Sequence, residues 1–363
     1  MRFQKQIILP ELGEAGQQRL AAGSVLVIGA GGLGCPALQY LAAAGIGRIG
    51  IVDFDVVEES NLQRQVLYTE QDLGKPKAEV AARQLQAMNR ALTLQVFITR
   101  IDTQNALELL ANFDVVLDAT DNFPTRYLVD DACRLLNKPL IYGSVFRFEG
   151  QMSVFHWPVD GVRTSYRDLF PVPPQPSEVA DCNEAGVLGV LPGIIGTMQA
   201  AEAIKLIAGL GVPMANRLFC YQLLNHSTYT LDLVPHTDAP AQAPASPEDF
   251  RGMNYEWFCN MPSVDYQDID GETFDQLRAN IAPQILDVRN LHEWPKVTEF
   301  EHLRIPLAEL ENNLHLIDPA RPLIVFCQSG VRSVTALTLL TERLPLQSVY
   351  HLKGGILKWK TQQ

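Results

Sequence analysis

The stretch VLVIGAGGLG at residues 25–34, followed by DFDVVEESNLQRQ at residues 53–65, decides the fold. The β-branched run Val25–Ile28 breaks at Gly29, and a helical pattern follows over 33–44. A strand that enters Gly-x-Gly-x-x-Gly and then a helix presents backbone N–H groups and a positive helix end to a phosphate. The sequence therefore predicts a nucleotide-binding α/β domain. The glycines of this loop are Gly29, Gly31, Gly32 and Gly34.

An acidic residue and a group of polar side chains follow the glycine loop. Asp53 stands at the end of the second predicted strand, where a carboxylate can accept hydrogen bonds from ribose hydroxyls. Taken with the glycines alone, this pattern favours an enzyme that uses NAD or FAD. Asn61, Arg64 and Gln65 change that interpretation, because an enzyme that splits ATP needs cations and amides around the phosphates. An NAD-linked oxidoreductase remains an alternative.

Two further positions fit an ATP site. Lys77 supplies a second cation, and Asp121-Asn122 follows the predicted strand over 114–118. A carboxylate at the end of a strand can hold Mg²⁺, which prefers few carboxylates together with phosphate oxygens. Other roles remain open: Arg64 as a surface residue, Lys77 as a solvated helix residue, and Asp121-Asn122 as a helix cap.

Strands and helices alternate in this part of the chain, which predicts a mostly parallel sheet with helices on both faces. The predicted strands are 24–28, 48–53, 94–99, 114–118 and 140–144, an additional pair within 147–156 that is antiparallel, and strands within 218–233. The predicted helices are 33–44, 75–89, 127–136 and 191–207, and 158–181 reads as a long crossing loop.

The segment PHTDAPAQAPASP at 235–247 is rich in Pro and Ala and is typical of a linker. We therefore expect one α/β domain over 1–234, a linker over 235–263 and a second, smaller α/β domain over 264–363. The second domain has predicted helices at 274–280 and 332–342 and predicted strands at 284–288, 323–327 and 348–352.

Five motifs in order resemble the MoeB/ThiF/HesA family, the bacterial relatives of ubiquitin-activating enzymes. They are GAGGLG at 29, DFDVVEESNLQRQ at 53, GKPKAE at 74, DATDNFPTRY at 118 and CNEAGVLGVLPGIIGTMQAAEAIKL at 182. The resemblance covers about residues 1–234 and implies a Rossmann-like fold and a homodimer. It also implies that ATP and Mg²⁺ are used to adenylate the C-terminal Gly-Gly carboxylate of a small ubiquitin-like sulfur-carrier protein.

The resemblance assigns roles to single residues. It implies that Gly31 and Gly32 line the nucleotide, that Asp53 holds the ribose and that Asp121 holds Mg²⁺. It implies phosphate contacts for Asn61, Arg64 and Lys77. The expected nucleotide site also includes Gly29, Gly34, Gln65 and Asn122. In this mechanism a carboxylate oxygen attacks the α-phosphorus and pyrophosphate leaves, so positioning and charge neutralisation supply the catalysis.

The chain departs from this family at two places. Many relatives bind structural zinc through two Cys-x-x-Cys pairs, but this chain has Ser165-Tyr166-Arg167-Asp168 and Pro235-His236-Thr237-Asp238 there. Tetrahedral zinc needs four thiolate or imidazole ligands, so we expect no zinc. Relatives often carry an Arg that reaches the partner subunit's ATP; here Lys5 stands at that position, with Arg2 nearby.

The cysteines divide into three groups. The resemblance gives Cys182 a role in sulfur transfer, in which it becomes linked to the carrier; the alternative is a small residue beside a buried helix. Cys35, Cys133 and Cys220 lie in helix or strand patterns and are expected in the core. Cys259 lies in the linker, and nothing marks it as reactive.

The loop CQSGVRS at 327–333 follows a predicted buried strand and opens a helix. A helix N-terminus and Arg332 both stabilise a thiolate at Cys327. With ILDVR at 285 and LKGGILKW at 352, this loop resembles a single rhodanese domain over about 264–363, which implies that Cys327 carries sulfur as a persulfide. The rival is a phosphatase of related fold, but those loops read Cys-x5-Arg, one residue longer. Asp287 and Arg289 are expected to brace the loop or the fold, in a structural role.

The charge and composition of the chain limit the kinds of partner that we expect. The net charge of -12 argues against nucleic acid, which requires concentrated Lys and Arg. The apolar run at 185–210 contains Gln199, Glu202 and Lys205, so we expect no membrane span. With no signal peptide and no Cys-x-x-Cys pair, we expect a cytoplasmic protein. The expected sulfur donor is a cysteine desulfurase or thiosulfate. A non-catalytic protein that binds a ubiquitin-like tail is the other alternative.

Overall fold

The computed structural model describes residues 2–171, 173, 186–236, 243–255, 266–346 and 348–361. These residues form two compact units. The first holds residues 2–170 and 186–235, and the second holds residues 171 and 173 together with the described residues from His236 onward.

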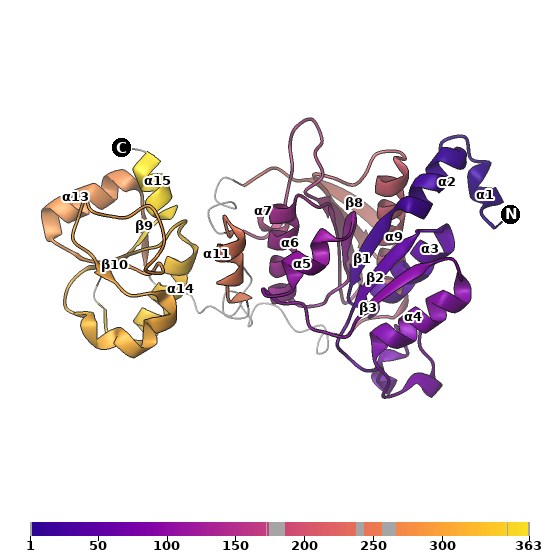
Figure 1. Cartoon of the computed structure of the whole chain (residues 1–363), viewed down its shortest axis with the longest axis horizontal. Coiled ribbons are helices and arrows are strands. Elements are labelled where there is room, and N and C mark those ends of the chain that lie inside the picture. Colours follow the sequence, from indigo (N-terminus) through magenta and orange to yellow (C-terminus); the bar gives the residue numbers. More distant parts are fainter. Residues whose placement is uncertain are drawn as a thin grey trace. The chain divides into compact units, whose positions relative to one another are not determined.

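The first unit is an eight-stranded sheet with helices on both faces (Figure 1). Its strands are β1 (Ser24–Ile28), β2 (Arg48–Val52), β3 (Thr93–Phe97), β4 (Val115–Asp118), β5 (Leu140–Phe146), β6 (Glu149–Phe155), β7 (Arg217–Gln222) and β8 (Ser227–Asp232). Its helices are α1 (Gln4–Ile7), α2 (Gly13–Ala22), α3 (Gly34–Ala44), α4 (Lys77–Met88), α5 (Ala106–Ala111), α6 (Phe123–Leu136), α7 (Tyr166–Leu169) and α9 (Val190–Ala208), with 3₁₀ turns at η1 (Glu59–Asn61) and η2 (Glu70–Asp72).

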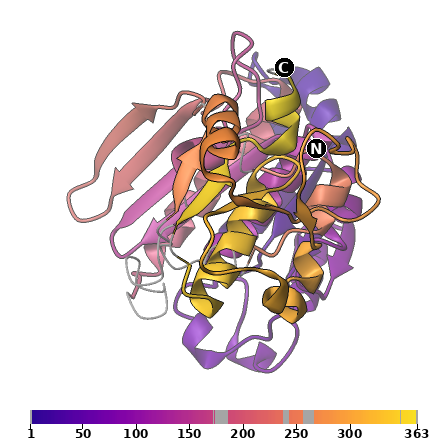
Figure 2. The same cartoon turned by 90° about the vertical axis from the view of Figure 1, so that its left-hand side faces the viewer.

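The strand order is β3-β2-β1-β4-β5-β6-β7-β8. The first five strands in this order are parallel, and β6, β7 and β8 extend the sheet as antiparallel strands. Strands β7 and β8 form the salmon hairpin in Figure 2. The predicted mostly parallel α/β fold is therefore confirmed. The position of the antiparallel pair was wrong: residues 147–156 do not hold two strands. The antiparallel pair consists of β5 and β6, because Arg147, with φ +53°, lies at the turn between them. The predicted crossing loop over 158–181 also contains a short helix, α7.

Burial explains why these segments form strands. All five residues of β1 are buried, as expected for a parallel strand covered by helices on both faces. Helices α3, α4 and α9 pack together on one face, and α5, α6 and α7 pack on the other (Figure 1). Leu38, Leu41 and Ile195 belong to the resulting core.

Helix α9 is long and apolar enough to cross a membrane by length and composition alone. In the structure it packs against α3, β5 and β6, and Leu191 and Ile195 are completely buried there. Its buried Gln199 donates to the carbonyl oxygens of Asp118 and Ile141. The helix is thus a core element of the first unit.

The second unit is a five-stranded parallel sheet in the order β11-β10-β12-β13-β9. Its strands are β9 (Gln267–Ile269), β10 (Gln284–Asp287), β11 (Leu303–Arg304), β12 (Leu323–Phe326) and β13 (Val349–Leu352). Its helices are α11 (Pro247–Arg251), α13 (Gly271–Ile281), α14 (Val331–Arg343) and α15 (Gly355–Thr361), with 3₁₀ turns at η3 (Leu307–Glu309) and η4 (Glu311–Leu316).

Alternation along these strands divides the core into two layers. Leu323 and Val325 pack with residues of α14, whereas Ile324 and Phe326 pack with Phe274 of α13 and Trp359 of α15. This is the period of two that a strand imposes. The helices and strands predicted for this domain are all present.

Part of the expected linker is folded. Helix α11 lies inside 235–263, and its Phe250 is completely buried, with its ring centroid 5.9 Å from that of Tyr255. Ser246 caps the helix by accepting a hydrogen bond from the backbone N–H of Asp249. The sequence pattern missed this helix because it is short and follows a run of Pro and Ala.

Candidate active sites

The glycine loop lies at the topological switch point of the first sheet. Strands β1 and β4 are neighbours in register, with Ile28 beside Asp118, while the strand order continues from β1 to β2 in the other direction. Open parallel sheets bind ligands at this point, beyond the carboxyl ends of the strands. Gly29 and Asp121 therefore come from adjacent strand ends.

Two glycines of the loop are required by its geometry. Gly29 has φ +94°, and a β-carbon there would lie 2.7 Å from the carbonyl oxygen of Ala119. A β-carbon on Gly34 would overlap the carbonyl oxygen of Gly29. The backbone of the loop thus closes on itself and on β4.

Asp53 braces this loop from below. Its carboxylate accepts hydrogen bonds from the backbone N–H of Ala30 at 2.7 Å and of Asp55 at 2.8 Å. Burial raises the pKa of Asp53, and those two hydrogen bonds oppose the shift. Each carboxylate oxygen retains a further lone pair, so the bracing is compatible with the predicted ribose contact.

The polar segment 61–65 covers the glycine loop. A β-carbon on Gly32 would lie 3.5 Å from Cγ of Arg64, and one on Gly31 would lie 3.6 Å from Nε2 of Gln65. The side-chain oxygen of Gln65 is buried and has no hydrogen-bonding partner among the described residues. An unpaired buried amide beside the loop is the kind of group that a bound nucleotide would satisfy.

Asn61 and Arg64 also have local contacts. The side-chain oxygen of Asn61 accepts from the backbone N–H of Glu58 at 3.2 Å, so this buried residue shapes the turn at η1. The guanidinium of Arg64 donates to the carbonyl oxygen of Ser60 at 3.0 Å and is half-buried. Arg64 is therefore not a freely solvated surface residue.

Lys77 is buried with its charge paired. Its side chain is 7% exposed, and Nζ lies 2.9 Å from Oδ2 of Asp55. The alternative of a solvated helix residue is thus excluded. The ammonium also opposes the rise in the pKa of Asp53, so it lies close enough to influence that carboxylate.

The structure separates Asp121 from Asn122. Asn122 is the N-cap of α6 and accepts from the backbone N–H of Thr125 at 3.0 Å, so the capping role belongs to this residue. Asp121 is exposed, and its charge contributes to the raised pKa of Asp118, for which burial is the main cause. Asp121 follows β4, the strand next to the one that leads into the glycine loop. An exposed carboxylate at this place fits a Mg²⁺ ion that shares its coordination with phosphate oxygens.

The N-terminal cations lie away from this site. Phe3 packs against Gly45, at the end of α3 opposite the glycine loop, and Arg2 donates to the carbonyl oxygen of Met88. A helix of 11 residues is about 16 Å long, so Lys5 of α1 is far from the loop of its own subunit. Its predicted contact with a partner subunit's ATP stays a prediction.

The position of the first missing zinc pair holds a hydrogen-bonded turn. Ser165 and Asp168 form a capping box at the start of α7, with the Asp168 carboxylate accepting from Ser165 Oγ at 2.8 Å. Arg167 between them is buried in a bidentate pair with Asp131. No group of three potential metal ligands occurs in the part of the chain that the structure describes.

The cysteine predictions divide accordingly. Cys35, Cys133 and Cys220 are buried, as expected, and burial raises the pKa of Cys35 to about 12. Cys182 and Cys259 lie outside the described residues.

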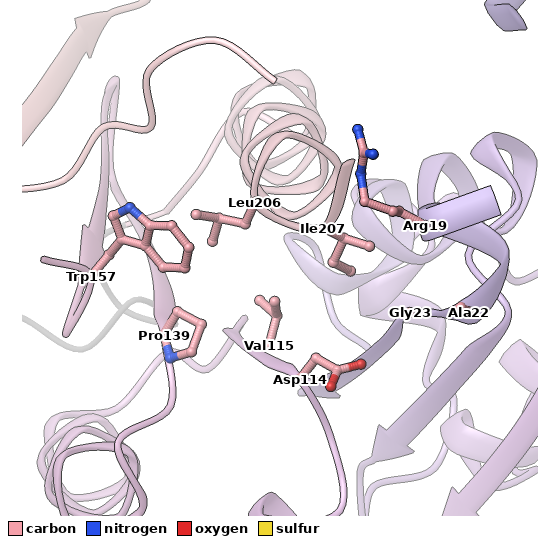
Figure 3. Close-up of a pocket in the computed structure, with 9 residues that line it drawn as sticks. All are labelled: Arg19, Ala22, Gly23, Asp114, Val115, Pro139, Trp157, Leu206 and Ile207. Atoms are coloured by element: carbon pink, nitrogen blue, oxygen red, sulfur yellow. The ribbon is translucent and has the colours of Figure 1, made fainter. Parts of the chain in front are cut away.

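A cavity of about 370 Å³ lies at the opposite end of the first sheet (Figure 3). It is lined by Arg19, Asp114, Pro139 and Trp157 among others. Its two charged side chains already have hydrogen-bonding partners, because Asp114 accepts from Ser24 and Arg19 donates to the carbonyl oxygen of Ala208. The cavity contains none of the predicted site residues.

Cys327 lies at the end of β12, at the start of the loop that leads into α14. It is completely buried, and its Sγ accepts a hydrogen bond from the backbone N–H of Gly330 at 3.2 Å. Ser333 Oγ lies 3.5 Å from the same sulfur atom. A backbone N–H at the start of the helix therefore faces the sulfur atom, which is the position that the sequence predicted; stabilisation of the thiolate by it stays a prediction.

Charged residues hold this loop in place. Arg289 and Asp287 form a completely buried bidentate pair, and Arg289 also donates to Gln328 at 3.2 Å. Both residues therefore brace the loop, as expected. Arg332 is less available to stabilise a thiolate at Cys327 than its position in the motif suggests. Its guanidinium donates to both carboxylate oxygens of Glu293, at 2.6 and 2.7 Å.

The sequence reasoning missed two residues near Cys327. His351 of β13 and Asp268 of β9 are hydrogen bonded to each other at 2.6 Å, and His351 also contacts Ser333. They are 83 positions apart, and no local motif links them.

The chain matches two protein-family models. Residues 3–241 match the ThiF family, and residues 271–362 match the rhodanese-like domain. The chain is 41% identical to a probable adenylyltransferase/sulfurtransferase MoeZ of Mycobacterium tuberculosis, over 99% of this chain and 93% of that protein. It is 48% identical to a sulfur carrier protein adenylyltransferase of Thermus thermophilus, over 72% and 96%. A crystal structure of E. coli MccB with ATP shares the fold, with a TM-score of 0.53, 24% identity and coverage of 62% and 68%.

Proposed function

This chain belongs to the ThiF family and continues into a rhodanese-like domain, and from this premise we propose that it adenylates the C-terminal Gly-Gly carboxylate of a ubiquitin-like sulfur carrier and then supplies the sulfur. The chain is accordingly an adenylyltransferase and sulfurtransferase. One observation carries the proposal: the chain combines a switch-point phosphate site, covered by Arg64 and Gln65, with a thiol at a helix N-terminus.

In the first step a carboxylate oxygen of the carrier attacks the α-phosphorus of ATP and forms a P–O bond. The bond from the α-phosphorus to the bridging oxygen breaks, and pyrophosphate leaves with its electron pair. The glycine loop supplies backbone N–H groups for the phosphates, and Asp53 keeps that loop closed. Arg64 and Lys77 supply the cations that neutralise developing charge. Mg²⁺, held by Asp121 and phosphate oxygens, would supply further charge neutralisation.

In the second step Cys327 accepts an outer sulfur atom from a donor, either a cysteine desulfurase persulfide or thiosulfate. The terminal sulfur of the persulfide then attacks the carbonyl carbon of the acyl-adenylate, a C–S bond forms, and AMP leaves with the electron pair of the broken C–O bond. A thiolate then attacks the Cys327 sulfur atom of the resulting acyl disulfide, the S–S bond breaks, and the thiocarboxylate leaves with its electron pair while a new disulfide forms. We keep Cys182 as the residue proposed to link covalently with the carrier during sulfur transfer. The linked domains raise the effective concentration of one site at the other.

We also propose a cytoplasmic homodimer. Lys5 lies at the end of α3 that is away from its own glycine loop, which supports a role for Lys5 or Arg2 of the partner subunit at the ATP site.

Pyrophosphate exchange tests the first step. We expect ATP–pyrophosphate exchange that requires a Gly-Gly-ended carrier encoded beside this chain, and a carrier without its last glycine is the matched control. No exchange with any such carrier would refute the proposal. A non-catalytic tail-binding protein would instead bind the carrier without exchange, and Arg64→Ala would weaken that binding.

A further inference from the structure

A continuous line of polar atoms connects Cys327 with the carboxylate of Asp268. Ser333 Oγ lies 3.5 Å from Cys327 Sγ and 3.0 Å from Nε2 of His351. Nδ1 of His351 lies 2.6 Å from Oδ1 of Asp268. Ser333 is completely buried and His351 is 6% exposed, so water does not compete freely for the hydrogen bonds of Ser333, whereas the Asp268 side chain is 48% exposed. Four elements contribute: the loop after β12, helix α14, and strands β13 and β9.

Hydrogen-bonding rules restrict the protons on His351. An ionised carboxylate only accepts, so Nδ1 must carry a proton to bond Asp268. Nε2 lies 2.9 Å from the carbonyl oxygen of Gly330, which also only accepts. When Nε2 is protonated it can donate to Gly330, and the Ser333 hydroxyl can donate to Cys327 or to the carbonyl oxygen of Gly330, which lies 3.0 Å from Oγ. When Nε2 is not protonated it must accept from Ser333 and faces a carbonyl lone pair.

The arrangement therefore fits one pair of states best: a protonated His351 together with a thiolate or persulfide anion at Cys327. We propose that Ser333 and His351 remove the thiol proton of Cys327 as it takes up sulfur, with His351 and Asp268 as positioning residues. The inference rests on the proposed sulfurtransferase function.

The step balances without an oxidant. The thiol proton passes to Ser333 Oγ while the hydroxyl proton of Ser333 passes to Nε2 of His351. The electron pair on Sγ of Cys327 attacks the outer sulfur of the donor, forming one S–S bond. The bond between that sulfur and the rest of the donor breaks, and its electron pair leaves as a thiolate or as sulfite.

The charges around His351 favour the transfer of a proton from Cys327 toward His351. The hydrogen bond from His351 is the main cause of the lowered pKa of Asp268, and Lys353 adds to it. Asp268 is thus ionised near neutral pH and can accept a hydrogen bond from Nδ1 of His351. Tyr266 packs edge-on against His351, with ring centroids 5.7 Å apart, and burial raises the pKa of this phenol, so it contributes no charge there.

Arg332 on α14 is another cation near Cys327. Burial opposes its charge, but the hydrogen bonds to Glu293 raise its pKa, and Asp249 lies 3.5 Å from the guanidinium. Two carboxylates therefore balance this cation. His351 is balanced by Asp268 alone, which leaves it as the group that can respond to the proton of Cys327.

Single-turnover persulfide formation on the full chain tests the proposal. Thiosulfate is the donor, and the persulfide is measured on the Cys327 peptide by mass spectrometry across a pH series. Because general acid–base groups contribute about 100-fold or more, we expect Ser333→Ala and His351→Gln to react at least about tenfold more slowly at neutral pH. The lost rate should return at high pH, where hydroxide removes the thiol proton. His315→Gln, an exposed histidine on η4, is the matched control and should match the wild type.

A double variant distinguishes the relay from a structural role. Ser333→Ala with His351→Gln should be no slower than Ser333→Ala alone, because the hydroxyl connects the imidazole with the thiol. Additive losses, or single variants with the wild-type pH profile, would overturn the relay. Ser333→Ala removes one oxygen atom and keeps the test valid if His351→Gln does not fold. If the wild type forms no persulfide, the sulfurtransferase proposal itself fails.

Discussion

Gly29→Ala is the substitution that tests most sharply how the first site is built. At φ +94° an added methyl group is strained, which costs about 1 to 2 kcal/mol. Its β-carbon would also lie 2.7 Å from the carbonyl oxygen of Ala119, so the ends of β1 and β4 must separate. Overpacking of this kind costs about 1 to 3 kcal/mol. We therefore expect a total loss of about 3 kcal/mol in the free energy of unfolding.

Gly161→Ala separates the two contributions. Gly161 has φ +81°, and nothing lies within 4 Å of its β-carbon position, so this variant has the backbone strain without the contact. At about 2 to 4 °C per kcal/mol, scanning calorimetry should show the first unit's melting temperature lowered by about 6 to 12 °C for Gly29→Ala. The same relation gives about 2 to 8 °C for Gly161→Ala.

Nucleotide affinity gives a second readout of the same variants. Gly29→Ala displaces the backbone N–H groups that face the phosphates, so we expect ATP binding by titration calorimetry to weaken more than about tenfold, the equivalent of 1.4 kcal/mol. Gly161→Ala should bind as the wild type does. Equal melting temperatures for the two variants, with unchanged ATP affinity, would refute this account of the loop.

Three further predictions concern charge and sulfur. Lys77→Ala should lower the rate of carrier-dependent pyrophosphate exchange by about 100-fold, the range found when one transition-state donor is removed. Lys75 is an exposed lysine two residues earlier, and Lys75→Ala should change the rate little. Equal exchange rates for the two variants would contradict a phosphate role for Lys77. Cys327→Ser should abolish persulfide formation and leave pyrophosphate exchange intact, and a parallel loss of exchange would mean that the sites are not separable. Burial alone would raise the pKa of Asp72, but hydrogen bonds led by that from Arg83 lower it to about 2. The contribution of ionised Asp72 to the stability of the fold should be complete above pH of about 4, which is the pKa of an unfolded Asp, and should disappear as pH falls through about 2. The difference in melting temperature between wild type and Asp72→Asn should therefore shrink over that window. A difference that stays constant would contradict the lowered pKa of Asp72.

The sequence predicted the fold well where local patterns decide it. The run Val25–Ile28 followed by a glycine loop, and the buried strand before Cys327, are visible because strand periodicity and glycine positions are local features. The two α/β units and most element bounds followed from such patterns. Helix α11 was missed because its five residues follow a Pro- and Ala-rich run.

Pairing across the fold could not be predicted in the same way. The sequence marked Lys77 as a cation for phosphates, but its buried pair with Asp55 depends on the approach of Val56 to Pro76. Likewise, Asp268 meets His351 only because β9 and β13 are neighbours in the second sheet. Register and strand order place such residues together, and neither is written in a local motif.

The most direct test of the central claim is the mass of the carrier itself. A ubiquitin-like carrier ending in Gly-Gly would be incubated with the full chain, Mg²⁺, ATP and thiosulfate, then measured intact under reducing conditions. We expect that one oxygen atom of the carrier is replaced by sulfur, and that Cys327→Ser stops the reaction before this replacement. A carrier of unchanged mass with the wild-type chain, despite active pyrophosphate exchange, would contradict the claim that one chain both activates the tail and delivers sulfur to it.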